Sequence, residues 1–77
     1  MFELYQLEQL VAVAECGTLS NAAEQPHISQ PALSRSMQRL EAELQVTLFI
    51  RKKNKIELNE NGRMAVGYAR KIMEQAH

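Results

Sequence analysis

The chain has 77 residues, of which 45% are hydrophobic, so it suits one small folded domain whose core is marginal unless a partner adds buried surface. No apolar run approaches about 18 residues and no basic-then-apolar leader is present, so we expect neither a membrane span nor secretion. Cys16 is the single cysteine and has no internal disulfide partner, which fits a reducing compartment.

The formal net charge is zero, but the charges are unevenly distributed. Residues 1–34 carry four Glu and no Lys or Arg, a charge of −4, whereas residues 35–77 carry nine Lys and Arg against five Glu, a charge of +4. Such polarity lets a domain present one face to phosphates. It also predicts modest non-specific affinity for a single copy, which dimerisation would raise.

The first predicted element is an amphipathic helix. Apolar residues recur at steps of three and four, namely Leu4, Leu7, Val11 and Ala14, with Leu10 and Val13 beside them. The helix is expected to end near Cys16, with Gly17 as the residue after its end. Its predicted role is core packing.

Residues 20–44 predict a short helix, a break of about four residues and a longer helix, which is the spacing of a helix-turn-helix. Ser20 is expected to cap the short helix, and the alanines at 22–23 are small enough for another helix to approach. Residues 26–27 break the pattern. Ser29 is expected to cap the longer helix, at residues 30–44.

The longer helix has two chemically distinct faces at about 100° per residue. The stripe predicted to be buried contains Leu33, Met37, Leu40 and Leu44. The opposite, polar face contains Pro31, Ser34, Arg35, Gln38 and Ala42, with Arg39 beside them. Donors near the N-terminus, with Glu41 and Glu43 only at the flanks of the last turn, are typical of a helix that enters the major groove of DNA.

After Leu44 the sequence becomes β-prone at residues 47–51 and again at 56–58, which predicts a two-stranded wing. Its tip carries Arg51, Lys52, Lys53, Asn54 and Lys55. A charge run is usually only a solvated loop. Beside a DNA-reading helix it favours contact with the phosphate backbone or the minor groove.

A last helix is expected to be capped by Asn59, with Glu60 in its first turn. Its apolar residues exceed what one core needs, and they include Met64, Val66 and Tyr68. The surplus predicts pairing with a second copy. The residues expected to form that contact are Ala65, Ala69, Ile72, Met73 and Ala76.

The predicted fold is therefore mainly α with a small two-stranded β-wing. A winged helix-turn-helix occupies residues 1–58, and a long linker and dimerisation helix follows at residues 59–77.

The run SNAAEQPHISQPALSRSMQRLEAELQVTLFIR, residues 20–51, closely resembles the DNA-binding domain of LysR-type bacterial transcriptional regulators. The elements AA, SQPALSR, RLE and LF-x-R occur in the family's order and spacing, and the resemblance extends from about Leu4 through Gly62 into the last helix. Pro26 stands where the family usually has leucine, and Gln45 where it usually has glycine. Both departures put local stability in question more than function.

The resemblance implies sequence-specific binding to double-stranded promoter DNA. From the SQPALSR motif it assigns base-edge and adjacent-backbone contacts to Gln30, Pro31, Ser34 and Arg35, with Gln38 in the groove. Arg35 suits either a guanine or a phosphate, and the sequence does not choose. The contacts expected on the DNA backbone come from Ser20, Asn21, Ser29 and Arg39.

The family pattern further implies a homodimer on partly palindromic sites, with higher oligomers open to a full-length parent, in the bacterial cytoplasm at the nucleoid. A small-molecule effector would be read by a further domain that this chain lacks. No metal or other cofactor is expected. The alternative interpretation is a winged-helix module that binds protein, and an enzyme ranks third because neither a metal-ligand spacing nor a phosphate loop is present.

Overall fold

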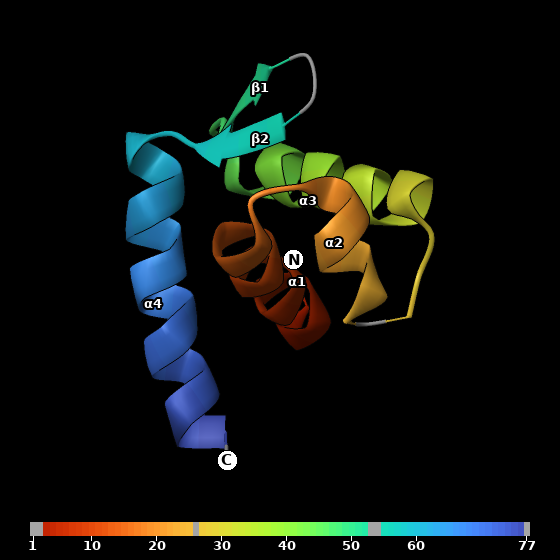
Figure 1. Ribbon diagram of the computed structural model, residues 1–77. Helices are drawn as coiled ribbons and strands as arrows, with labels where there is room; N and C mark the ends of the chain where they lie inside the picture. The colour runs from red at the N-terminus through yellow and green to blue at the C-terminus, as the bar shows by residue number, and fades with distance from the viewer. Residues whose placement is uncertain (1–2, 26, 53–54, 77) are drawn as a thin grey trace.

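The computed structural model describes residues 3–25, 27–52 and 55–76 (Figure 1). The elements occur in the predicted order. They are α1 (Leu4–Cys16), α2 (Leu19–Glu24), α3 (Gln30–Leu44), β1 (Phe49–Lys52), β2 (Lys55–Leu58) and α4 (Glu60–Ala76). The mainly helical fold with a small wing, predicted from the sequence, is confirmed.

Helix α1 lies at the centre, with α2 and α3 on one side, α4 along the other and the two strands above (Figure 1). The core contains apolar side chains from all of these elements, among them Leu10, Ala22, Leu33, Met37, Leu40, Leu48, Phe49, Ile56, Val66 and Ala69. The predicted apolar stripe of α1 needs one correction. Leu4 is 45% exposed, whereas Gln6 and Gln9 are buried, because helices pack against α1 from several sides.

The start of the helix-turn-helix differs from the prediction. The N-cap of α2 is Thr18, whose side-chain oxygen accepts a hydrogen bond from the Asn21 backbone N–H at 3.1 Å. Ser20 is therefore not the cap but an exposed residue of the first turn. Both hydroxyl residues are good caps, and the core decides between them, because a helix beginning at Leu19 packs that leucine against the buried cluster.

The start of α3 agrees with the prediction. Ser29 is the N-cap, its side-chain oxygen accepts from the Ala32 N–H at 3.1 Å, and Pro31 lies in the first turn. The connection from α2 runs from Gln25 to Ser29, one residue longer than expected. The predicted helix break at Pro26 lies on a residue outside the described part of the chain.

The residue that follows α3 shows how the chain tolerates the missing glycine. Gln45 adopts the left-handed conformation, with φ 60° and ψ 33°, and its N–H donates back into the last turn of the helix. The chain thus makes the left-handed turn that glycine favours while paying the steric cost of a side chain there. Gly17, after α1, has the same left-handed backbone, as predicted.

Strands β1 and β2 form the predicted antiparallel wing, with Phe49 opposite Leu58 and Lys52 opposite Lys55. The first strand begins two residues later than predicted because the preceding backbone bonds to other elements. The Thr47 carbonyl accepts from the Asn59 side chain at 2.9 Å. Lys53 and Asn54, predicted at the tip, lie outside the described residues.

The backbone of Leu48 joins the helix-turn-helix, the wing and α4. Its N–H donates to Glu41 of α3 at 2.7 Å, and its carbonyl accepts from the Asn59 N–H at 2.9 Å. Asn59 caps α4 as predicted, since its side-chain oxygen accepts from the Gly62 N–H at 2.8 Å. The first turn of α4 is consequently pressed against Leu48.

Helix α4 turns inward part of the face that was predicted to pair with a second copy, so that prediction is partly wrong. Ala69 is fully buried and Met73 packs against the core, so these two residues belong to the domain's own interior. The large exposed apolar residues on α4 are Met64, Tyr68 and Ile72, spaced four residues apart on one stripe. Ala65 is half-buried, and the side chain of Ala76 lies outside the described part.

Gly62 is expected to be the glycine on which the domain's stability depends. A Cβ at this position would lie 2.2 Å from the Leu48 carbonyl oxygen, a backbone atom that cannot move away cheaply. Replacing Gly62 by Ala should lower the free energy of unfolding by about 1–3 kcal/mol, measured by urea denaturation at one protein concentration.

Gly67→Ala is the matched control within the same helix. Nothing lies within 4 Å of its added Cβ, so the substitution should raise the free energy of unfolding by roughly 0.5–1 kcal/mol through helix propensity alone. Equal effects at the two glycines would contradict the close approach at Leu48.

Candidate nucleic-acid interface

The inward stripe of α3 fixes which of its faces is presented to a partner. Leu33, Met37 and Leu40 are completely buried, and Leu44 is half-buried. The Ser36 hydroxyl also donates a hydrogen bond to the side-chain oxygen of Gln9 on α1. The orientation predicted for this helix is confirmed, and rotating it would remove three large side chains from the core.

The outward face of α3 contains the residues predicted to reach DNA bases. Gln30, Pro31, Arg35 and Gln38 are exposed, while Ser34 is half-buried. Arg39 and Ala42 are exposed on the same side, further towards the C-terminus. The face offers amide, hydroxyl and guanidinium groups, with the half-buried Glu41 and Glu43 at its borders.

A cleft of about 390 Å³ brings three separate segments of the sequence together. Its walls come from the first turn of α2, the first residue of α3 and the wing. The residues that line it are Thr18, Leu19, Ser20, Gln30, Arg51, Lys52, Lys55 and Ile56. Residues from all three predicted groups of DNA contacts thus meet at one place: Ser20 from the backbone group, Gln30 from the base-reading group, and Arg51, Lys52 and Lys55 from the wing.

The wing cations have acidic partners that the sequence reasoning missed. Glu57 pairs with Lys52 at 3.2 Å and with Lys55 at 3.8 Å, and Arg51 pairs with Glu41 of α3 at 3.6 Å. The pair of Glu57 with Lys55 could have been predicted from the sequence, because residues two apart on a strand share one face. The exposed pairs leave the lysines accessible, since such ion pairs are weak in water.

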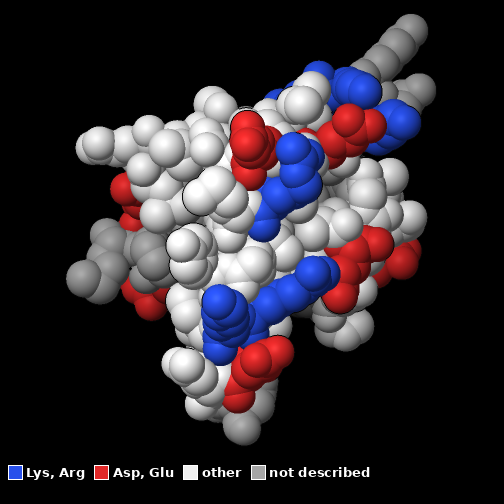
Figure 2. Space-filling model, turned by 90° about the vertical axis from the view of Figure 1, so that its left-hand side faces the viewer, with Lys and Arg blue, Asp and Glu red and all other residues white. Residues whose placement is uncertain are grey.

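The surface charges are grouped by element (Figure 2). A group of Lys and Arg side chains lies at the upper right of that view, around the wing, whereas basic and acidic side chains alternate on the surface of α4. On α4 one such pair is Arg70 with Glu15 of α1, at 3.7 Å. The excess positive charge of the C-terminal half is therefore most available for binding a phosphate at the wing and α3.

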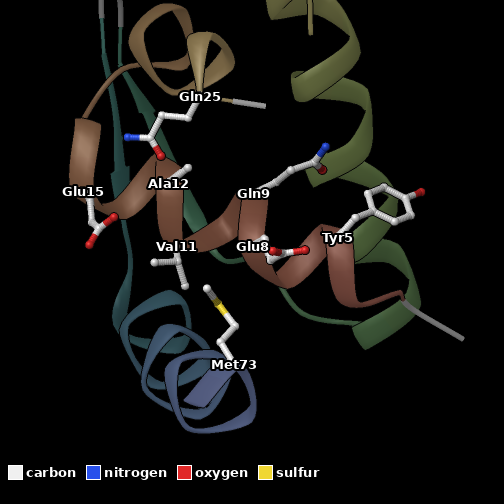
Figure 3. Close-up of a pocket in the computed structure, with 8 residues that line it drawn as sticks. All are labelled: Tyr5, Glu8, Gln9, Val11, Ala12, Glu15, Gln25 and Met73. Atoms are coloured by element: carbon white, nitrogen blue, oxygen red, sulfur yellow. The ribbon is translucent and has the colours of Figure 1, made fainter. Parts of the chain in front are cut away.

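Another cavity, of about 320 Å³, lies along α1, between α2 and the end of α4 (Figure 3). Val11, Ala12 and Met73 form its apolar part, and Glu8 and Glu15 lie at its border. Within the described ranges no three His, Cys, Asp or Glu residues are grouped so that they could hold a metal ion. None of the described helices combines the length and apolar character needed to cross a membrane.

The model of the bacterial regulatory helix-turn-helix proteins of the lysR family matches residues 4–63. The chain belongs to the LysR family. The match includes α1, the helix-turn-helix, the wing and the first turn of α4, and so contains every residue of the cleft.

Individual LysR-family relatives are similar over nearly the whole chain. The HTH-type transcriptional regulator TcbR of Pseudomonas sp. (strain P51) is 45% identical over 96% of this chain and 25% of its own length. The SDS degradation transcriptional activation protein of Pseudomonas sp. (strain ATCC 19151) is 42% identical over 96% of this chain and 24% of its own length. The chain therefore spans about a quarter of these curated relatives.

Solved structures of LysR-family DNA-binding domains have the same fold. The CbnR domain in its DNA complex is 44% identical with a TM-score of 0.94, covering 97% of this chain and 86% of that one. The BenM domain in complex with benA site 1 DNA is 35% identical with a TM-score of 0.91, covering 97% of this chain and 84% of that one. The winged helix-turn-helix class is thus confirmed.

Proposed function

We propose that this LysR-family domain binds double-stranded promoter DNA sequence-specifically, with α3 in the major groove and the wing on the backbone or in the minor groove. The observation that carries the proposal is the continuity of the polar face of α3 with the basic cleft. Support also comes from similar domains, CbnR and BenM, whose structures are complexes with DNA.

On α3 we assign base reading to the exposed residues of the first two turns. The Gln30 amide suits the paired donor and acceptor of adenine, and Arg35 suits either the two acceptors of guanine or a phosphate. Pro31 and Ser34 lie between them, close to base edges. Gln38 and Arg39, further along the same face, position the helix on the groove and backbone.

In the cleft we assign contacts to one DNA strand. Ser20 lines the cleft, and Asn21 follows it in the first turn of α2, at the positive end of the helix dipole, which favours an anion. Lys52 and Lys55 lie on the opposite wall, in the wing. Ser29 uses its side chain to cap α3, so its proposed backbone contact shares that oxygen.

We further propose that two copies associate through α4 and bind two half-sites. The exposed stripe of Met64, Tyr68 and Ile72 is the apolar surface available for this contact, together with the half-buried Ala65. A two-fold dimer matches a partly palindromic site with half-sites roughly 10 base pairs apart. Promoter DNA as the ligand implies that the domain acts in the bacterial cytoplasm.

In-vitro selection of duplexes from a random pool is the direct test of sequence-specific binding. The selected duplexes should share one motif, repeated with two-fold symmetry at the half-site spacing. A selection that returns no preferred sequence would overturn the proposal.

On the selected duplex, Arg35→Ala should weaken binding by about 1–3 kcal/mol and relax the preference at one base pair, because a bidentate contact is lost. The measurement is a titration at fixed salt. Arg70→Ala, which removes the same charge from α4, is the control and should leave the affinity within roughly 0.5 kcal/mol. A loss below about 0.3 kcal/mol for Arg35→Ala would remove it from the base-reading set.

Binding to an unrelated duplex should fall steeply with salt, because each phosphate contact releases counterions. Lys55→Ala should reduce the slope of log affinity against log salt by about one unit, with little change in sequence preference. Affinity that does not depend on salt would favour a protein-binding module instead.

Tyr68→Glu should weaken self-association at least about tenfold, because it places a charge in the centre of the apolar stripe of α4. Sedimentation equilibrium measures the effect, and Glu74→Gln on the same helix is the control. Unchanged association of the Tyr68 variant, or a wild-type chain that stays monomeric at high concentration, would contradict pairing through this stripe.

A further inference from the structure

Glu41 lies near the end of α3, where its carboxylate contacts Leu48, just before β1, and Arg51 within β1. Its Oε2 accepts from the Leu48 N–H at 2.7 Å, and its Oε1 lies 3.6 Å from the Arg51 guanidinium. The Glu41 side chain is 16% exposed, against 41% for that of Arg51. Glu41 therefore connects the proposed recognition helix to the one wing arginine that lines the cleft.

A carboxylate beside a surface that binds phosphate repels the phosphate, which is unfavourable unless the carboxylate interacts with donors or cations of the protein itself. Here the carboxylate has two partners: it accepts a charge-assisted hydrogen bond from the Leu48 backbone N–H, and it forms an ion pair with the Arg51 guanidinium. Glu41 also holds the loop through its main chain, because its carbonyl accepts from the Val46 N–H at 3.2 Å. Glu41 thus joins the end of α3 both to the loop that follows it and to β1.

These contacts orient the guanidinium group of Arg51. The Arg51 guanidinium has two neighbours: the Glu41 carboxylate at 3.6 Å and the Phe49 ring, whose centroid is 5.9 Å from the guanidinium carbon. A guanidinium has five N–H donors, so a single pairing leaves others available to a phosphate. An arginine that is already held in place loses less side-chain entropy when it binds.

We propose that Glu41 is a positioning residue for DNA binding: it holds Arg51 at the cleft and sets the wing relative to α3, and it touches no DNA itself. The inference rests on the proposed DNA-binding function and adds to it a coupling between helix and wing. It predicts that removing an acid near the DNA weakens binding, whereas simple charge repulsion predicts tighter binding.

The test is a double-mutant cycle of Glu41→Gln and Arg51→Ala, with affinity for the selected duplex measured at fixed salt. The glutamine oxygen can still accept from the Leu48 N–H, so the substitution isolates the charge. Glu41→Gln should weaken binding about 3- to 10-fold in the wild-type background and less than about 1.5-fold in the Arg51→Ala background.

Glu15→Gln is the control, because it removes an equal charge and a similar pair, to Arg70 at 3.7 Å, on the surface between α1 and α4. Its affinity should match the wild type. Urea denaturation of every variant gives its folded fraction, so that lost stability is not mistaken for lost binding.

Tighter binding of Glu41→Gln in both backgrounds would show repulsion alone and overturn the proposal. Equal weakening in both backgrounds would show that Glu41 acts without Arg51, which also overturns it. Either result leaves the DNA-binding proposal intact as long as Arg35→Ala weakens binding, so the two failures can be told apart.

Discussion

The burial of one side of α3 is the constraint on which the rest of the structure depends. Leu33, Met37 and Leu40 lie in the core with no exposure, so rotating the helix would bring large apolar side chains into water. Because those three side chains point into the core, the polar side chains on the opposite side of α3 point away from it. The proposed base contacts of Gln30 and Arg35 are thus a consequence of packing on the opposite side of the same helix.

The wing shares the apolar core with this helix and is joined to it by polar bonds as well. Leu48 is bonded through its N–H to Glu41 and through its carbonyl to Asn59, which also caps α4. One short segment therefore sets the position of both the wing and the last helix. Gly62, in the first turn of α4, leaves no room for a side chain beside Leu48.

The zero net charge of the chain is compatible with binding an anionic polymer because the charges are separated in space. Basic residues of the wing, Arg51, Lys52 and Lys55, line the cleft, whereas basic and acidic side chains alternate on the surface of α4 (Figure 2). Glu41 and Glu57 reduce the local excess of positive charge by pairing with Arg51 and Lys52. DNA binding by this domain would therefore depend more on where its side chains are placed than on its net charge. That is typical of sequence-specific binding and not of non-specific binding.

The sequence by itself determined the features that depend on neighbours along the chain. The bounds of α3, its Ser29 cap, its buried stripe and the left-handed Gly17 follow from helical periodicity and local backbone chemistry. The SQPALSR and LF-x-R elements were specific enough to indicate the LysR family.

Only the tertiary structure decided which of several locally equivalent choices was made. Thr18 and Ser20 are comparable caps, yet packing makes Thr18 the N-cap of α2. Ala69 and Ile72 are both apolar, yet packing buries Ala69 and leaves Ile72 exposed. The bonds from Glu41 to Leu48 and Arg51 join elements whose relative placement no local pattern specifies. Such contacts depend on how helices and strands meet, and that is fixed by the shared core rather than by spacing along the chain.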